Sequence, residues 1–321
     1  FESVVDRDPV VEVFGRIRHY PIPVGGRPPD NKGRTVHCPD ERLAQQRPSA
    51  PPRSYPDTIS AMFLERLDRV RAAMKERDID VVLLSVGPDL PWLVGYEAMP
   101  LERLTMLVVP VDGEAELLLP ALEVARVVER PEVFSVQGWT ETEDPVRLVA
   151  DRIRGVNTAA VGDRTWSRFL IGLQHELPGV NWSSAGKVVG PIRAVKTEAE
   201  IERLQAAASG VDRIAAALQG GEIPLIGRTE ADVSADLGRR ILAEGHAEVN
   251  FAIVASAENA ASPHHHAGSR VIQANEVVLC DFGGTTAEPD GLPGYCSDIT
   301  RCVYTGNPPS EFTEQYDALQ D

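Results

Sequence analysis

The chain has 321 residues and a formal net charge of −16, with 43% hydrophobic and 25% charged residues. This composition is ordinary for a globular protein and argues against disorder along the whole chain. The acidic excess repels nucleic acid and anionic membrane surfaces, so neither is expected as a partner. No apolar run approaches the roughly 18 residues that a membrane-spanning helix needs. The four cysteines are scattered, which is typical of free thiols in a reducing cytoplasmic compartment.

Residues 1–55 are rich in proline and show neither helical nor strand periodicity. We expect an irregular extension there. A flexible tail or a poorly defined gene start is the simple interpretation, and a regulatory arm is the functional alternative.

Residues 56–190 predict an α/β domain, because helical and strand patterns alternate along them. An amphipathic helix begins near Thr58, and Pro88 and Pro91 are expected to break the chain after the first strand. The further helices are expected at 121–129 and 145–153, and the strands at 80–86, 104–109, 114–119, 134–137 and 158–162.

Residues 191–321 predict a second domain, with Gly190 and Pro191 marking the boundary. Two capping boxes, Thr197 with Glu200 and Thr229 with Asp232, predict the starts of two helices. Strands are expected at 250–255, 276–282 and 295–304, followed by a helix at 310–319.

Two acidic residues in this second domain are candidate metal ligands. Asp281 interrupts an apolar run that is typical of a buried strand, where a carboxylate is costly unless it is paired or binds a metal. Asp298 lies in the next predicted strand. If the two strands pair antiparallel, both side chains can share one face, and a divalent cation between them would remove their repulsion. Taken alone, Asp281 could instead belong to a turn before Gly283, and Asp298 could pair with Arg301.

The run His264-His265-His266 is the third chemical feature. Adjacent histidines often lie in a solvent-exposed loop. The alternative is a metal site, because imidazoles together with carboxylates suit Mn, Zn, Co or Fe in a two-metal hydrolase.

Taken together, three strings resemble a metallopeptidase family. They are Pro263-His264-His265, Asp281-Phe-Gly-Gly284, and Gly294-Tyr-Cys-Ser-Asp298-Ile-Thr-Arg301. The family includes prolidase, aminopeptidase P and methionine aminopeptidase, and the resemblance covers roughly residues 58–321. It implies a creatinase/prolidase-type α/β N-terminal domain followed by an incomplete α+β "pita-bread" catalytic domain.

The resemblance also implies roles for individual residues. Two divalent ions (Mn, Zn or Co) are held in this family by two Asp, one His and two Glu. Asp281 matches a ligand of one ion, and Asp298 matches the ligand that bridges both. His264 matches the histidine that assists proton transfer and stabilises the tetrahedral intermediate, and His265 is a candidate substrate-binding residue. The remaining His and two Glu ligands are not found after Asp298.

The leading hypothesis is therefore a fragment of an Xaa-Pro dipeptidase or aminopeptidase, inactive by itself. The complete protein would cleave the bond before proline in short peptides, and the resemblance suggests a homodimer. The alternatives are a creatinase-like amidinohydrolase, which needs no metal, and a non-catalytic peptide-binding protein with the same fold.

Overall fold

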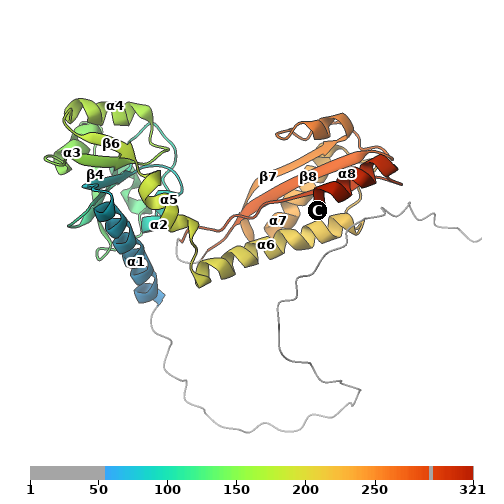
Figure 1. Ribbon diagram of the computed structural model, residues 1–321, viewed down its shortest axis with the longest axis horizontal. Coiled ribbons are helices and arrows are strands. Elements are labelled where there is room, and N and C mark those ends of the chain that lie inside the picture. The colour runs from blue at the N-terminus through green and yellow to red at the C-terminus, as the bar shows by residue number, and fades with distance from the viewer. Residues whose placement is uncertain (1–54, 289–291, 321) are drawn as a thin grey trace, which may run out of the picture.

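The computed structural model describes residues 55–288 and 292–320, which form two folded units (Figure 1). The irregular segment predicted at residues 1–55 lies outside these residues, except for Tyr55, where the first helix begins. Figure 1 shows the N-terminal unit in blue to green and the C-terminal unit in yellow to red.

A six-stranded mixed sheet forms the centre of the N-terminal unit, with the strand order β4-β3-β2-β1-β5-β6. Its strands are β1 (Val81–Leu84), β2 (Met106–Pro110), β3 (Ala115–Pro120), β4 (Phe134–Trp139), β5 (Thr158–Val161) and β6 (Asn181–Ser184). Strand β2 runs antiparallel to β1 and β3, and the other neighbours are parallel. The predicted α/β domain is confirmed.

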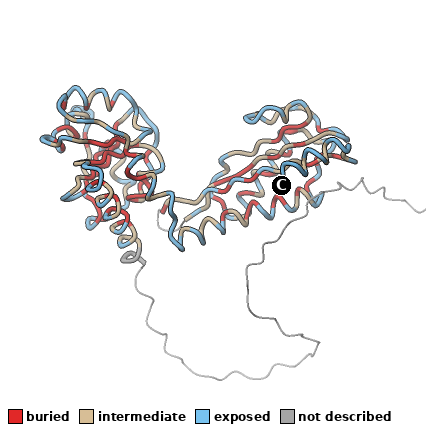
Figure 2. Tube along the Cα trace, viewed as in Figure 1, coloured by how far each residue is buried: buried red, intermediate tan, exposed pale blue. Residues whose placement is uncertain are grey.

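Helices cover both faces of this sheet. The hydrophobic cluster on one face includes α1 (Tyr55–Glu76) and α5 (Gly186–Ala194), and that on the other includes α3 (Pro145–Arg152) and α4 (Ser167–Glu176). Strand β1 shows how the chain fills both clusters, because Val82 and Leu84 face α1 while Val81 and Leu83 face α3. Figure 2 shows the buried strands of this sheet, flanked by helices that carry both buried and exposed residues.

One proline-based prediction in this unit was wrong. Pro88 and Pro91 do not interrupt the chain but begin a short helix, α2 (Asp89–Val94), with Pro91 in its first turn, where a backbone N–H has no partner within the helix. Gly190 and Pro191, where the sequence predicts the boundary between the domains, lie within α5. The burial of its Val188 and Val189 in the N-terminal core keeps this helix in place. The helix predicted at 121–129 is a 3₁₀ segment, η1 (Ala121–Arg126), and α4 and β6 were not predicted.

The C-terminal unit has two long helices on one side of a three-stranded antiparallel sheet, β7-β8-β9. Its elements are α6 (Glu198–Gln219), α7 (Glu230–Ala243), β7 (His246–Ser256), η2 (Ala257–Ala261), β8 (Val277–Thr286), β9 (Ile299–Tyr304) and α8 (Ser310–Gln320). Both predicted capping boxes are present at the starts of α6 and α7.

The two faces of this second sheet differ. Val278, Cys280 and Phe282 of β8 point toward α6 and α7 and are fully buried. The alternate residues Leu279 and Asp281 point to the opposite face and are only half-buried. This opposite face, called the open face below, carries the predicted metal ligands.

A buried ion pair joins the two units at the start of α6. Arg66 of α1 donates to Glu200 at 2.8 Å and to the carbonyl of Trp92 at 2.6 Å. The side chains of Arg66 and Glu200 are 7% and 12% exposed, so water screens the pair little. The second oxygen of Glu200 accepts from the Thr197 N–H at 2.8 Å, so one carboxylate both caps α6 and binds the N-terminal unit.

The connection between β8 and β9 also reaches the N-terminal unit. Leu292 is buried in the N-terminal hydrophobic cluster, and the guanidinium of Arg203 lies 5.9 Å from the centre of the Tyr295 ring. Arg203 also lies 3.7 Å from Glu288. Within residues 55–288 and 292–320, no helix is both long and apolar enough to cross a bilayer.

Candidate active site

Asp281 lies in β8, and Asp298 lies immediately before the antiparallel strand β9, which begins at Ile299 and not at residue 295 as the sequence predicts. Asp281 pairs with Thr300 in the register of β8 and β9, and its Oδ1 accepts from the Thr300 hydroxyl at 2.8 Å. Asp298 lies two residues before Thr300, so strand alternation places it on the same open face. Asp281 therefore belongs to a strand and not to a turn. Arg301, the alternative partner considered for Asp298, donates instead to the Thr300 carbonyl at 2.8 Å.

The two glycines after Asp281 allow the strands to approach closely here. A side chain at Gly283 would collide with the backbone carbonyl of Ser297, and one at Gly284 would collide with the carbonyl of Glu248. The Ser297 N–H donates to the Gly284 carbonyl at 2.8 Å. The sequence Asp281-Phe-Gly-Gly284 thus brings the segment that carries Asp298 against the strand that carries Asp281.

A buried histidine holds this segment from the other side. His246 Nε2 lies 2.8 Å from the hydroxyl of Ser297, the residue before Asp298, and the Gly284 N–H donates to the same hydroxyl at 3.2 Å. Both His246 and Ser297 are buried. The sequence pattern did not single out either residue, because their pairing spans 51 positions.

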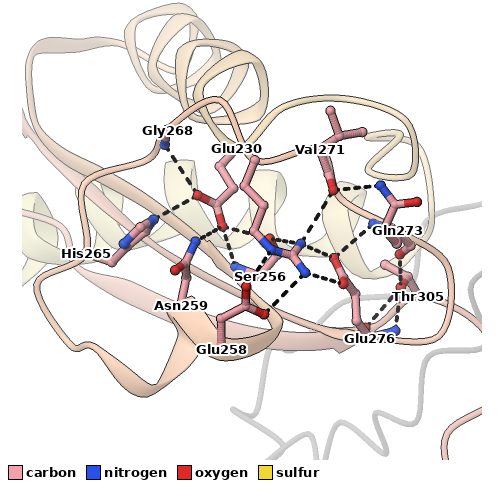
Figure 3. Close-up of polar contacts among 11 residues, drawn as sticks. Glu230, Ser256, Glu258, Asn259, His265, Gly268, Val271, Gln273, Glu276 and Thr305 are labelled. Carbon is pink, nitrogen blue, oxygen red and sulfur yellow. Dashed lines mark hydrogen bonds and ion pairs between the residues drawn. The ribbon is translucent and has the colours of Figure 1, made fainter.

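The three adjacent histidines lie in the loop between η2 and β8, and they differ in environment. His264 and His266 are exposed, whereas His265 is half-buried. His265 Nε2 lies 2.8 Å from Oε2 of Glu230, the first residue of α7 (Figure 3).

Glu230 is a fully buried acid, and both of its carboxylate oxygens have hydrogen-bond partners. Its Oε1 accepts from the Ser256 N–H at 2.8 Å, the Ser256 hydroxyl at 2.7 Å and the Asn259 amide at 3.0 Å. Its Oε2 accepts from His265 and from the Gly268 N–H at 3.3 Å. Burial raises the pKa of Glu230, but these hydrogen bonds outweigh burial and hold the pKa at about 2.

A second ion pair anchors the other end of the histidine loop. Arg270 binds Glu276 through two hydrogen bonds of 2.7 and 2.8 Å, and it donates to the Ser256 hydroxyl at 2.8 Å. These hydrogen bonds to Glu276 raise the pKa of Arg270. Ser256 therefore joins the Glu230 group to Arg270, and Figure 3 shows the continuous chain of contacts.

The sequence did not identify Glu230 as a buried residue in contact with the histidine loop. The capping-box pattern identified Thr229 and Asp232 as the start of α7. It assigned Glu230 to the first turn of that helix and predicted no contacts for its side chain. A glutamate beside an N-cap is common on surfaces, so only the folded position of Ser256 and His265 reveals its burial.

The donor set fits a divalent cation in part. Two carboxylates on one face are hard oxygen donors of the kind that Mn or Zn accepts in hydrolases. Among residues 55–288 and 292–320, however, no group of three or more His, Cys, Asp or Glu side chains is placed to hold a metal. A metal held by Asp281 and Asp298 would therefore need further ligands.

Known proteins show which class of protein combines these two units. The profile of the family described as "Creatinase/Prolidase N-terminal domain" matches residues 66–195. The profile described as "Metallopeptidase family M24" matches residues 202–321. The mixed sheet thus corresponds to the first family, and the unit that carries Asp281 and Asp298 corresponds to the second.

Individual relatives agree with these profiles. The "Probable dipeptidase PepE" of Mycobacterium tuberculosis is 36% identical over 263 residues, which cover 81% of this chain and 68% of the relative. The crystal structure of dipeptidase PepE from Mycobacterium ulcerans has a TM-score of 0.74 at 36% identity, covering 81% of this chain and 69% of that one. A prolidase from Thermococcus sibiricus has a TM-score of 0.70 at 25% identity, covering 79% and 69%.

The fold and the sequence together define a two-domain metallohydrolase. The chain belongs to metallopeptidase family M24 and carries the creatinase/prolidase-type N-terminal domain of that group. The resemblance seen in the sequence is confirmed, as is the implied order of the two domains.

Proposed function

We propose that this chain is part of a dipeptidase of the prolidase type, which hydrolyses dipeptides whose second residue is proline. The observation that carries the proposal is the pairing of β8 with β9, which the bridge between Thr285 and Cys296 continues and which supports a shared open face for Asp281 and Asp298. The relatives support it, since the similar proteins are named dipeptidase and prolidase.

Asp281 and Asp298 would hold the metal pair, and Mn, Zn and Co are the candidate ions. When bound, such ions supply an activated water and polarise the scissile carbonyl. Hydrolysis would need one His and two Glu ligands from outside residues 55–288 and 292–320. We propose that residues 55–321 alone are inactive for this reason.

His264 is our candidate for proton transfer during hydrolysis. Its imidazole is exposed and is therefore accessible to a substrate. His265 is proposed to bind substrate through the ring nitrogen that faces away from Glu230. The Thr300 hydroxyl, which donates to Asp281 Oδ1, leaves the other oxygen of Asp281 available for a ligand.

Three further proposals follow from the resemblance and are open to direct measurement. We propose a homodimer, a cytoplasmic location, and a division of the chain into 1–55, 56–190 and 191–321. A creatinase-like amidinohydrolase is the less favoured alternative, because that reaction does without metal and would not require Asp281 and Asp298. A non-catalytic peptide-binding protein is disfavoured for the same reason.

The test is hydrolysis of an Xaa-Pro dipeptide and a matched Xaa-Ala dipeptide by the complete gene product, after removal of metal and reloading with Mn²⁺ or Zn²⁺. We expect cleavage that depends on metal and favours the proline substrate. Asp298→Asn should abolish it, and Asp317→Asn, which changes an exposed acid on α8, should not.

Each result has a separate meaning. Equal cleavage of both dipeptides would support peptidase activity but would contradict the preference for proline. Full activity after Asp298→Asn, or activity without metal, would reject the proposed function itself.

A further inference from the structure

Glu230 can only accept hydrogen bonds near neutral pH, since the four donors supplied by Ser256, Asn259 and Gly268 keep it ionised. A carboxylate 2.8 Å from His265 Nε2 therefore requires a proton on that nitrogen. In a neutral imidazole the other nitrogen, Nδ1, then carries the lone pair. The buried glutamate thus selects one of the two tautomers of His265.

The carboxylate cannot rotate to follow a moving histidine ring. Ser256 and Asn259 supply three donors to Oε1, and the Gly268 N–H binds Oε2 beside His265. Ser256 is itself held by Arg270. The position and direction of the accepting oxygen are therefore fixed by the fold before His265 binds to it.

The same group of contacts seats the histidine loop on the start of α7. The backbone N–H groups of Glu230 and Ala231 donate to the carbonyls of Arg270 and Gly268, both at 3.0 Å. These N–H groups belong to the first turn of the helix, where no partner exists within the helix. The loop after His264 is thus bound by backbone contacts and by the buried carboxylate together.

We propose that Glu230 is a positioning residue: it sets the tautomer and place of His265 and, through that residue, the loop that presents the adjacent His264. The effect on catalysis rests on the proposed function. The effect on His265 rests only on the contacts of Figure 3 and can be measured without substrate or metal.

The experiment is long-range ¹H–¹⁵N correlation NMR of the imidazole nitrogens in the ¹⁵N-labelled 321-residue chain. His265→Gln removes one set of signals and so assigns His265 among the seven histidines. Spectra are recorded at about pH 9, where an imidazole with an ordinary pKa near 6.5 is neutral. We expect the wild-type His265 to be the Nε2–H tautomer.

Glu230→Gln should reverse this state. A glutamine amide keeps one acceptor and gains a donor, and the three donors at Oε1 hold its oxygen there. The NH₂ group then faces His265 Nε2, which must accept, so His265 should switch to the Nδ1–H tautomer. The matched control is Glu258→Gln, which removes an exposed carboxylate of the same polar cluster and should leave the His265 signals unchanged.

The wild-type spectrum alone can overturn the proposal, so the test does not depend on whether Glu230→Gln folds. The proposal is wrong if wild-type His265 is the Nδ1–H tautomer or exchanges rapidly between the two tautomers. An unchanged tautomer in folded Glu230→Gln would also overturn it.

The catalytic consequence is measured separately in the metal-loaded gene product. We expect Glu230→Gln to lower kcat about 10- to 100-fold, because a displaced proton-transfer group costs about that much. KM should rise as well, because the nitrogen of His265 that is proposed to bind substrate changes from an acceptor to a donor. Glu258→Gln should change neither. If His265 switches tautomer but kcat does not fall, Glu230 does not act on His264. If the wild-type protein itself hydrolyses no dipeptide, the proposed function is wrong.

Discussion

His246 Nε2 lies 2.8 Å from the Ser297 hydroxyl in the interior of the C-terminal unit, and this contact joins the first residue of β7 to the residue before Asp298. His246 Nδ1 is buried and has no hydrogen-bond partner within residues 55–288 and 292–320. The ring therefore depends on Ser297 for its polar contact. The orientation of Asp298 is in this way tied to the packing of the sheet core.

Ser297→Ala should lower the free energy of unfolding by about 1–3 kcal/mol, because it leaves the buried His246 nitrogen and the Gly284 N–H without their shared partner. Urea titration followed by circular dichroism measures the change. The matched control is Ser183→Ala at an exposed position of β6, which should stay within about 0.5 kcal/mol of wild type. Equal stability of all three proteins would contradict the role of Ser297.

Arg66 and Glu200 should show strong energetic coupling. Burial lowers the pKa of Arg66 more than the nearby Glu200 carboxylate raises it, so either charge becomes costly once its partner is removed. Arg66→Met and Glu200→Gln should each destabilise the protein, and the double variant should lose less than their sum, with a coupling energy on the order of 0.5–3 kcal/mol.

The control for this cycle is Glu198→Gln, which removes an exposed acid from the same first turn of α6. It should show no coupling to Arg66→Met. Additive losses for Arg66 and Glu200 would mean that the pair does not hold the two units together.

Glu230 should make stability depend on pH in the acid range. Its folded pKa of about 2 lies below the ordinary value of 4.5, so its contribution is fully present above about pH 4.5 and is lost as the pH falls toward 2. The contribution is on the order of 3 kcal/mol. The stability difference between wild type and Glu230→Gln, measured by urea titration from pH 6 to 2.5, should shrink as acid is added. A difference that stays constant over this range would contradict the hydrogen bonding assigned to Glu230.

The cysteines of the C-terminal unit should differ in reactivity. Burial raises the pKa of the Cys280 thiol to about 12, and the side chain is fully buried, whereas Cys296 is exposed. A thiolate is the reactive form, so Cys280 should react with a disulfide reagent at pH 8 only after unfolding. Cys296 should react in the native protein. Mass spectrometry of labelled peptides distinguishes the two sites, and rapid native labelling of Cys280 would contradict the placement of β8 in the core.

Local signals explain what the sequence could predict. Capping boxes act within four residues, and both helix starts at Thr197 and Thr229 were found from them. The apolar run around Asp281 and the strand pattern at residues 295–304 likewise predicted two strands. Their antiparallel pairing was a condition of the metal-site hypothesis, and β8 and β9 do pair in this way.

Features that depend on distant contacts were not accessible in this way. Pro191 normally favours a break, but the buried Val188 and Val189 keep α5 continuous through it. The burial of Glu230 depends on Ser256 and His265, which lie 26 and 35 positions away. Sequence spacing alone gave no sign of either contact, so the anchoring of the histidine loop could be seen only in the fold.

The most direct test of the central claim is the metal content of the complete gene product after loading with Mn²⁺ and dialysis, compared among wild type, Asp281→Asn and Asp298→Asn. If the open face of β8 and β9 holds the metal pair, wild type should retain about two ions per chain. Asp298→Asn should then lose both ions, and Asp281→Asn at least one. Equal metal content in all three proteins would show that these carboxylates are not ligands and would contradict the account of the site.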